Sequence, residues 1–141
     1  MEECLFCNII SGKLPSYTVF EDEDTKAFLD IYGSAPGHTV VILKTHGKTI
    51  HEYAPENLGK LMKTVQTVSA ALQKAFATAV LTIGINHGEP LGVHHLHIHI
   101  IPRTPDDEGG VIQSIVKRPF TEDFAVTQKR IKGQLQVASK Q

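Results

Sequence analysis

Polar and hydrophobic residues alternate strictly in one stretch of this 141-residue chain. Every second position there is a histidine, and the positions between are aliphatic: His95, Leu96, His97, Ile98, His99 and Ile100. Because successive side chains of a β-strand point to opposite faces, the three imidazoles are predicted to share one face, with the aliphatic residues in a core behind them. We therefore predict a strand over residues 93–101 that carries a row of titratable rings.

Hydrophobic residues recur every three or four positions in other stretches, which predicts helices. The longest begins at Pro55, a residue favoured in the first turn, and extends over about five turns. Its apolar positions are Leu58, Leu61, Met62, Val65, Val68, Leu72 and Phe76. A short helix is predicted over 4–11, ended by Gly12, and a last one from a cap at Thr121 to about Leu135.

Segments rich in β-branched and aromatic residues predict strands at 18–21, 26–29, 38–43 and 79–85, and a short β-like piece at 111–116. These strands adjoin through short loops, so the predicted fold class is α+β with a mainly antiparallel sheet. The length and the 41% hydrophobic content fit a single domain over residues 1–141.

The formal net charge is −1 and the charges are well mixed, so we expect binding neither to duplex nucleic acid nor to an anionic membrane. No apolar run reaches about 18 residues, and no transmembrane helix is predicted. The N-terminus is acidic and lacks the basic-then-apolar pattern of a secretory signal, so a cytoplasmic protein is expected.

Three imidazoles on one strand face suit different kinds of chemistry. A neutral imidazole can attack phosphorus while its neighbours stabilise charge and protonate a leaving group. Histidines two apart on a strand can instead share one zinc ion, and a histidine-rich strand can also simply face solvent. In a reducing compartment, Cys4 and Cys7, the only cysteines, indicate metal binding or redox chemistry rather than a structural disulfide.

The alternating stretch resembles the His-φ-His-φ-His-φ-φ motif of the histidine-triad superfamily of nucleotide hydrolases and transferases. Further blocks follow in that family's order: Cys4-Leu-Phe-Cys7, Val19-Phe-Glu-Asp22, Ala27-Phe-Leu-Asp30-Ile31, Pro36-Gly-His38 and Lys44-x-His46. They resemble the branch of bacterial triad proteins and histidine-triad nucleotide-binding proteins, and they cover a core of about 4–103, with a C-terminal extension and its helix over 104–141. The resemblance implies a histidine-triad fold with one long central helix, and a homodimer.

The resemblance also implies roles for individual residues. His97 would attack the α-phosphorus and form a nucleotidyl-histidine, and His99 would contact the phosphate or the leaving atom. His95 would orient its neighbours or bind zinc, and His38 would support the triad from an adjacent strand. Asp30 would accept hydrogen bonds from both ribose hydroxyls. The implied nucleotide-binding set comprises Leu5, Phe6, Ile9, Asp30, Ile31, Asn86, Gly92, Val93, His97 and His99.

Several of these residues also fit ordinary structural roles. Asp30 and Asn86 suit turns, and His38 suits a satisfied strand histidine. The apolar residues at 5, 6 and 9 suit any core. Three further histidines are expected outside the triad, two at the surface and one on the opposite parity: His51, His87 and His94.

Zinc-containing relatives imply a structural zinc site made by two thiolates and two imidazoles: Cys4, Cys7, His46 and His95. Four protein ligands would close the coordination sphere, so this zinc would serve structure and catalysis would need no metal. The alternative is two reduced cysteines packed as small hydrophobic residues.

One segment departs from the family pattern. The family usually carries a Gly-Gln-x-Val run just before the triad. Here the segment reads Gly88-Glu-Pro-Leu-Gly92-Val93, so it is two residues shorter than the family's segment and lacks Gln and Ser. A loop glycine such as Gly92 still offers its backbone N–H to a phosphate.

The expected function is hydrolysis or transfer of a purine nucleoside monophosphate group, with AMP or GMP as that group. Nucleoside phosphoramidates, adenylylated amines and dinucleoside polyphosphates are the expected substrates. The alternatives are a nucleotide-binding or scaffold protein with little turnover, and a metallohydrolase in which the triad holds catalytic zinc.

Overall fold

The computed structural model describes residues 4–139 of the chain. Contacts divide these residues into two compact units, with the boundary between Gly109 and Gly110. The first unit holds an antiparallel sheet and the helices that cover it, and the second holds a short 3-10 turn, η2 (Ile112–Ser114), and the helix α3 (Phe124–Ser139). That both belong to a single domain stays a prediction.

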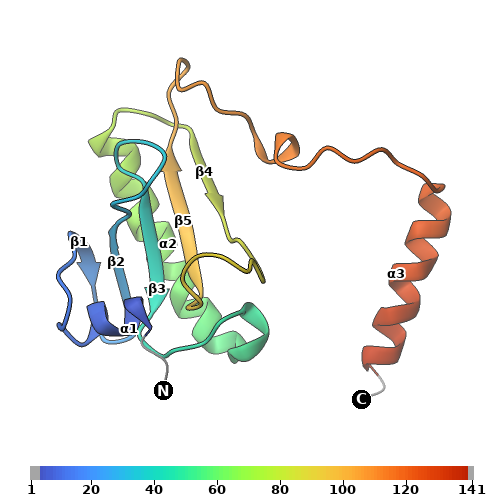
Figure 1. Cartoon of the computed structure of the whole chain (residues 1–141), viewed down its shortest axis with the longest axis horizontal. Helices are drawn as coiled ribbons and strands as arrows, with labels where there is room; N and C mark the ends of the chain where they lie inside the picture. The colour runs from blue at the N-terminus through green and yellow to red at the C-terminus, as the bar shows by residue number, and fades with distance from the viewer. Residues whose placement is uncertain (1–3, 140–141) are drawn as a thin grey trace. The chain divides into compact units, whose positions relative to one another are not determined.

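The sheet of the first unit has the strand order β1-β2-β3-β5-β4, and every neighbouring pair is antiparallel (Figure 1). Its strands are β1 (Thr18–Glu21), β2 (Thr25–Leu29), β3 (Thr39–Leu43), β4 (Leu81–Gly84) and β5 (His97–Pro102). The helices are α1 (Leu5–Ile10) and α2 (Pro55–Ala75), with a 3-10 turn, η1 (Ile50–Glu52), before α2. The predicted α+β class with a mainly antiparallel sheet is confirmed.

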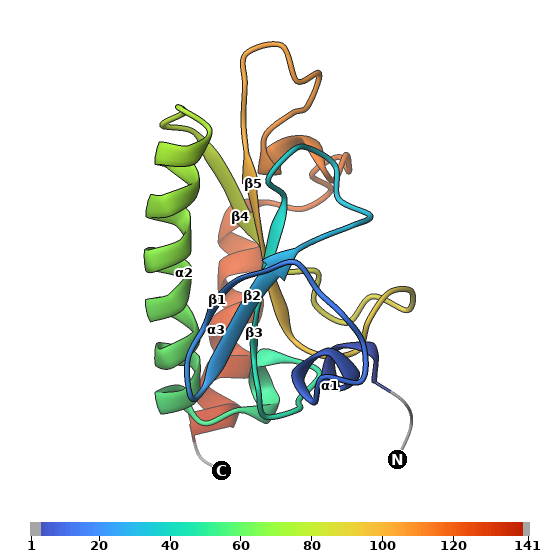
Figure 2. The same cartoon turned by 90° about the vertical axis from the view of Figure 1, so that its left-hand side faces the viewer.

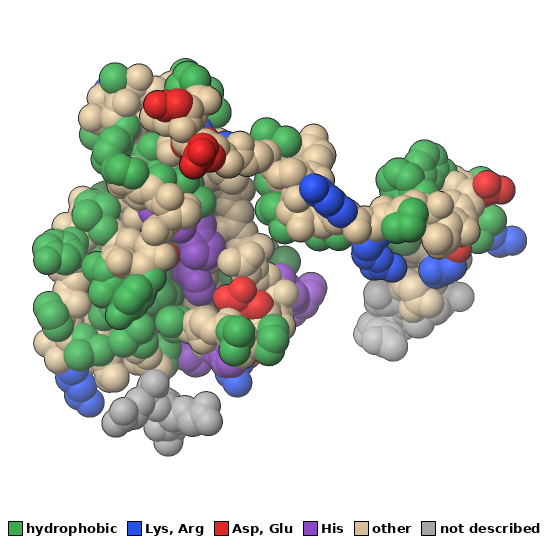
Figure 3. Space-filling view, turned by 45° about the horizontal axis from the view of Figure 1, so that its top comes forward, with side chains coloured by type: hydrophobic (Ala, Val, Ile, Leu, Met, Phe, Trp, Pro, Cys, Tyr) green, Lys and Arg blue, Asp and Glu red, His purple; other side chains and the backbone are tan. Residues whose placement is uncertain are grey.

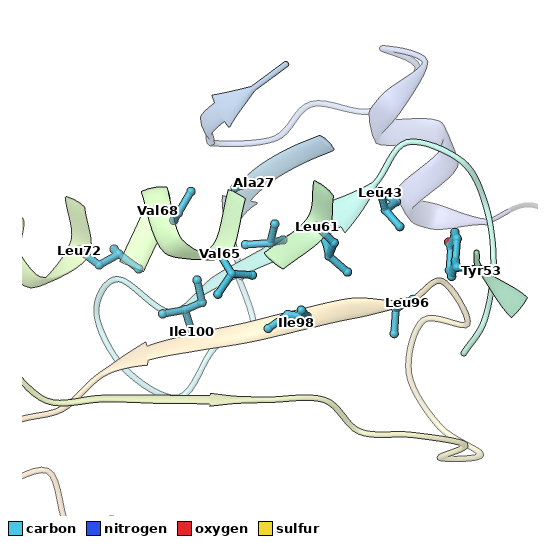
Figure 4. Close-up of a cluster of buried hydrophobic side chains, with 11 residues drawn as sticks. Ala27, Leu43, Tyr53, Leu61, Val65, Val68, Leu72, Leu96, Ile98 and Ile100 are labelled. Atoms are coloured by element: carbon cyan, nitrogen blue, oxygen red, sulfur yellow. The ribbon is translucent and has the colours of Figure 1, made fainter. Parts of the chain in front are cut away.

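The long helix α2 covers one face of the sheet, as Figure 2 shows in profile. Its buried residues Leu61, Val65 and Val68 pack on side chains from β2, β3 and β5. Figure 4 shows this cluster, in which Ile98 and Ile100 lie under the helix. The spacing of three and four residues that predicted the helix therefore also identified most of the face it buries, although Met62 is largely exposed and Phe76 lies just beyond the end of α2.

The short helix α1 lies on the opposite side of the sheet from α2 (Figure 2). Its buried residues Phe6 and Ile9 pack on Phe28, Val40 and Ile42, which form a second hydrophobic cluster. The Phe6 and Phe28 rings meet edge to face, with centroids 5.2 Å apart. Truncation of a buried phenylalanine of this kind to alanine typically lowers the free energy of unfolding by about 3–5 kcal/mol.

Three element predictions need correction. The histidine strand begins at His97 rather than at residue 93, because the backbone N–H of Leu96 donates to the carbonyl oxygen of Gly47, outside the sheet. The predicted β-like piece at 111–116 contains the 3-10 turn η2 instead of a strand. The last helix begins at Phe124, where the N–H of Thr127 reaches the carbonyl of Asp123, so Thr121 stands outside it.

Within residues 4–139, no helix combines the length and the apolar character needed to cross a bilayer.

Candidate nucleotide site and metal centre

His97 and His99 project from β5 on the side of the sheet that carries α1. In the antiparallel pairing of β3 with β5, His99 lies opposite Val40 and His97 lies opposite Ile42, and both partners belong to the α1 cluster. The Phe6 ring meets the His97 ring edge to face, with centroids 5.1 Å apart. Figure 3 shows histidine side chains exposed between hydrophobic ones on this part of the first unit.

A cavity of about 660 Å³ opens beside these two rings. Its volume lies within the range of about 300–1,000 Å³ that is typical of small-molecule sites. All ten residues of the predicted nucleotide-binding set line it: Leu5, Phe6, Ile9, Asp30, Ile31, Asn86, Gly92, Val93, His97 and His99. The structure therefore brings together residues from α1, the end of β2, the 85–93 loop and β5.

Among the described residues, nine more line the cavity that the sequence did not predict: Leu14, Pro15, Ser16, Tyr17, Phe28, Leu29, Tyr32, Val40 and Glu89. Among them, Tyr17 and Tyr32 are 70% and 90% exposed, which is unusual for tyrosine and offers rings to a planar ligand. Both tyrosines lie outside the helices and strands, where no hydrophobic periodicity could indicate that they line a cavity. Glu89 was visible only as the residue that replaces the expected loop pattern.

The ring of His97 is held by the main chain. Its Nδ1 lies 2.7 Å from the carbonyl oxygen of His95, an atom that can only accept, so Nδ1–H donates this hydrogen bond. In a neutral imidazole the other nitrogen then carries a lone pair. In that form the lone pair is on His97 Nε2, and this nitrogen belongs to a residue that lines the cavity.

A chain of hydrogen bonds fixes the protons on His38 and His99. The backbone N–H of Ser34 donates to His38 Nδ1 over 2.9 Å, which leaves the proton of His38 on Nε2. His38 Nε2 lies 2.9 Å from His99 Nδ1, so His99 accepts there and carries its own proton on Nε2. Within residues 4–139 that buried Nε2 has no hydrogen-bond partner. A buried donor without a partner is rare in folded proteins and points to a functional role for this nitrogen.

Burial keeps both of these rings uncharged. It lowers the pKa of His99 to about 4, with the neighbouring His97 and His38 rings acting in the same direction. Burial also lowers the pKa of His38, although the Asp30 carboxylate opposes the shift. The neutral tautomers assigned to His38 and His99 are therefore the ones present near pH 7.

Asp30 lies at the end of β2, beside this chain of histidines. Its Oδ1 accepts the backbone N–H of Tyr32 at 2.9 Å, and its Oδ2 lies 3.6 Å from His38 Nε2. The carboxylate both forms a turn and lines the cavity, so the structural and the ligand-binding interpretations of Asp30 are compatible.

His95 lies just before β5 and directs its ring to a different partner set. Its Nε2–H donates to the carbonyl oxygen of Leu43 at 2.8 Å, and its Nδ1 faces Cys4, Cys7 and His46. Two thiols and two imidazole nitrogens thus lie within 4.8 Å of one another. The structure brings together the four residues predicted as zinc ligands.

The spacing of these atoms fits a tetrahedral zinc ion. Bonds of about 2.0–2.1 Å to nitrogen and about 2.3 Å to sulfur imply N···N and N···S edges of about 3.3 and 3.6 Å. The two Nδ1 atoms of His46 and His95 are 3.2 Å apart, and Cys7 Sγ lies 3.4 and 3.6 Å from them. Cys4 Sγ lies 3.5 Å from His95 Nδ1. Burial and the adjacent Cys4 raise the pKa of the Cys7 thiol, so a bound cation would be needed to favour its thiolate form.

Outer contacts hold this cluster beside the reactive strand. The Tyr53 hydroxyl donates to the carbonyl oxygens of Thr45 and Gly47, and burial raises the pKa of Tyr53 to about 12. The same Gly47 carbonyl receives the N–H of Leu96. The segment that carries His46 is thereby joined to the one that carries His95, as is usual for the surroundings of a metal site.

The three remaining histidines take no part in these contacts. His51, His87 and His94 are all exposed. The rings of His51 and His87 lie with centroids 5.2 Å apart, and His94 lines a smaller neighbouring cavity of about 320 Å³. They lie outside the nucleotide cavity and the metal cluster, as the sequence predicted.

Comparison with known proteins places this arrangement in a family. The model of the HIT domain matches residues 11–106. Protein hit of Bacillus subtilis is 41% identical over 110 residues, covering 77% of this chain and 76% of that protein. An adenosine 5'-monophosphoramidase of Saccharomyces cerevisiae is 34% identical over 110 residues, covering 77% of this chain and 67% of its own. This chain belongs to the HIT family.

One solved structure that resembles this chain contains zinc. A zinc-bound histidine triad family protein from Mycobacterium smegmatis has a TM-score of 0.70 and 27% identity to this chain, and the alignment covers 99% of this chain and 98% of that one. The resemblance to the histidine-triad superfamily that the sequence predicted is confirmed.

Proposed function

We propose that this protein hydrolyses or transfers nucleoside monophosphate groups by attack of His97 on the α-phosphorus. The single observation that carries the proposal is the hydrogen bond from His97 Nδ1–H to the His95 carbonyl, which in the neutral imidazole puts the lone pair on Nε2, in a residue that lines the cavity. Such an imidazole attacks without prior removal of a proton.

The first step forms one bond and breaks one. His97 Nε2 bonds to the α-phosphorus, and the bond from phosphorus to the leaving group breaks. The leaving group departs with that electron pair and takes a proton from solvent. The positive charge that develops on the His97 ring is stabilised through Nδ1–H by the His95 carbonyl, which is already in place.

The second step breaks the bond between phosphorus and His97. Water attacks the same phosphorus and loses one proton to solvent, the bond to His97 Nε2 breaks, and the nucleoside monophosphate leaves. The ring returns to its starting neutral form because Nδ1 keeps its proton throughout. An acceptor alcohol or amine in place of water would make the reaction a transfer.

His99 supports both steps as a hydrogen-bond donor. Its buried Nε2–H faces no partner among the described residues and is suited to a phosphate oxygen or the leaving atom. Because its pKa is lowered to about 4, His99 acts as a neutral donor and not as an imidazolium ion. Removal of one such donor typically costs about 100- to 1,000-fold in kcat.

The cavity walls supply the nucleoside site. Phe6, Ile9 and Ile31 offer apolar surface to a base, and the Asp30 carboxylate can accept two ribose hydroxyls. We infer a purine nucleotide such as AMP or GMP as the group bound, with a nucleoside phosphoramidate or a dinucleoside polyphosphate as substrate. The yeast relative, named as an adenosine 5'-monophosphoramidase, supports the first of these substrate classes.

Zinc would be held by Cys4, Cys7, His46 and His95 and would stabilise the fold around the histidine segment. Neither cluster of possible metal ligands among the described residues contains His97; the second comprises Asp30, His38 and His99. The geometry therefore favours a nucleophilic triad over the alternative in which the triad holds catalytic zinc. We further propose a cytoplasmic homodimer.

A binding or scaffold role with little turnover is the second candidate. It is favoured by one observation, the shortened loop that places Glu89 rather than glutamine beside Gly92. Mononucleotide binding with negligible hydrolysis of several phosphoramidates would establish that role instead.

The test is the rate of AMP release from an adenosine phosphoramidate by the wild type and by His97→Ala. We expect at least a 1,000-fold lower kcat in the variant, with nucleotide binding retained. His94→Ala, which removes an exposed histidine three positions away, serves as the matched control and should retain wild-type activity. Undiminished turnover by His97→Ala would remove His97 from its assigned role.

A further inference from the structure

The Glu89 side chain lies at the reactive end of the nucleotide cavity. It lines the 660 Å³ cavity together with His97 and His99, and it also lines the adjoining 320 Å³ cavity together with His97. A β-carbon built on Gly92 would lie only 2.5 Å from Glu89 Oε1. A carboxylate therefore stands against the backbone of the glycine that we assign to phosphate binding.

Among the described residues, no cationic side chain pairs with the Glu89 carboxylate. Within residues 4–139, Glu89 makes no hydrogen bond and no ion pair, in contrast to Glu21, which pairs with Lys26 and Lys44. The described lining of the larger cavity includes two carboxylates, Asp30 and Glu89, and neither lysine nor arginine. Lys48 lines the smaller cavity, but no ion pair joins it to Glu89.

A charge that lines the same cavity as a reacting group affects which substrate binds and reacts. Two unit charges about 4 Å apart in water interact strongly enough to change an equilibrium about fivefold, and by more where solvent is partly excluded. A carboxylate therefore favours a cationic substituent and disfavours an anionic one by similar factors. A polyphosphate leaving group would bring several negative charges to this place.

We propose that Glu89 selects the leaving group by charge, so that the preferred substrates are nucleoside phosphoramidates of amines that carry a further positive charge. Dinucleoside polyphosphates are disfavoured for the same reason. This inference rests on the proposed function, because it names the substrate class that the His97 site takes.

Three adenosine phosphoramidates of similar size test the inference with the full-length protein. Their amine substituents are aminobutyl, pentyl and carboxypropyl, which present a positive, a neutral and a negative end. We expect kcat/KM to fall in that order, with the cationic compound preferred over the anionic one by at least about tenfold in dilute buffer. The preference should shrink at about 1 M salt, where screening acts within about 3 Å.

The decisive variant is Glu89→Gln, which removes the charge and keeps the shape. We expect the ratio of cationic to anionic kcat/KM to fall to within about threefold, and Glu89→Lys to invert the order. Glu23→Gln is the matched control, since Glu23 is exposed and lies outside both cavities, and its substitution changes the net charge by the same amount. It should keep the wild-type ratio.

A charge preference that survives in Glu89→Gln, or that is absent from the wild type while the neutral compound is hydrolysed, overturns this inference and leaves the proposed function standing. If none of the three is hydrolysed, the proposed function fails. Calorimetry of the same three compounds with the wild type and with Glu89→Gln then decides the inference. Charge selection predicts that the wild type binds the cationic compound most tightly and the anionic one least tightly, and that Glu89→Gln loses this order.

Discussion

His97 Nδ1 lies 2.7 Å from the carbonyl oxygen of His95, and this contact relates the two histidines in an unexpected way. The side chain of His95 faces the cysteine cluster, whereas its main chain orients the ring of His97. One residue thus links the proposed metal centre to the nitrogen that we propose to react. Structural and catalytic predictions can therefore be made separately for each end of this link.

The acid sensitivity of the fold tests the buried state of His99. Its pKa is lowered from an ordinary value near 6.5 to about 4, so between these pH values the unfolded chain binds more protons than the native one. The free energy of unfolding should therefore fall as pH decreases from about 7 to 4. After allowance for partial exposure, His99 should contribute about 1–2 kcal/mol to that fall.

Urea unfolding at a series of pH values measures this effect. His99→Gln should have a flatter pH dependence than the wild type, whereas the exposed His94→Gln should leave the slope unchanged. Equal slopes in all three proteins would show that His99 is not buried in its neutral form.

Gly33 tests the hydrogen-bond chain that sets the His99 tautomer. A β-carbon at this position would lie 2.7 Å from His38 Cβ and 2.8 Å from His38 Cγ. We expect Gly33→Ala to displace the His38 ring, to lower kcat about 10- to 100-fold with little change in KM, and to cost about 1–3 kcal/mol of stability. Steady-state kinetics on an adenosine phosphoramidate would measure the separation of kcat from KM.

Gly59→Ala is the control for that substitution, because Gly59 lies in α2 and a β-carbon there meets nothing within 4 Å. It should leave activity intact and stabilise the helix by up to about 1 kcal/mol. Wild-type kcat in Gly33→Ala would contradict the positioning role of the 33–38 loop.

Elemental analysis and thermal unfolding test the cysteine and histidine cluster. We expect about one zinc ion per chain, and a lower Tm in Cys7→Ser and after treatment of the wild type with a strong chelator. Returning zinc should restore the Tm of the wild type only. Protein that stays folded without metal should still hydrolyse substrate, because His97 belongs to neither metal-ligand cluster of the described residues. If the purified protein contains no metal and its Tm does not change when chelator is added, the proposal of a structural zinc ion is wrong.

Much of this arrangement could be predicted from local sequence pattern. The alternation around His97 and His99 identified the face they share, and the spacing in 55–76 identified α2 and its buried stripe. Both signals are strong because buried residues recur with the period of the element itself, two residues in a strand and about 3.6 residues in a helix.

The rest depends on contacts between distant segments. The alternation already begins at His95 and Leu96, yet the backbone N–H of Leu96 donates to the Gly47 carbonyl and the strand starts later, at His97. The segment 111–116 is rich in β-branched residues, but no neighbouring strand pairs with it among the described residues, and local propensity did not decide its structure. The histidine tautomers depend on backbone atoms of Ser34 and His95, which no sequence pattern reveals.

The stereochemical outcome at phosphorus tests the central claim most directly. A substrate with a chiral α-phosphorothioate, hydrolysed in oxygen-labelled water, reports whether phosphorus is attacked once or twice. Attack by His97 followed by attack of water inverts the centre twice, so we predict net retention of configuration. Net inversion would mean that water attacks the substrate directly, and would contradict a nucleotidyl-histidine intermediate.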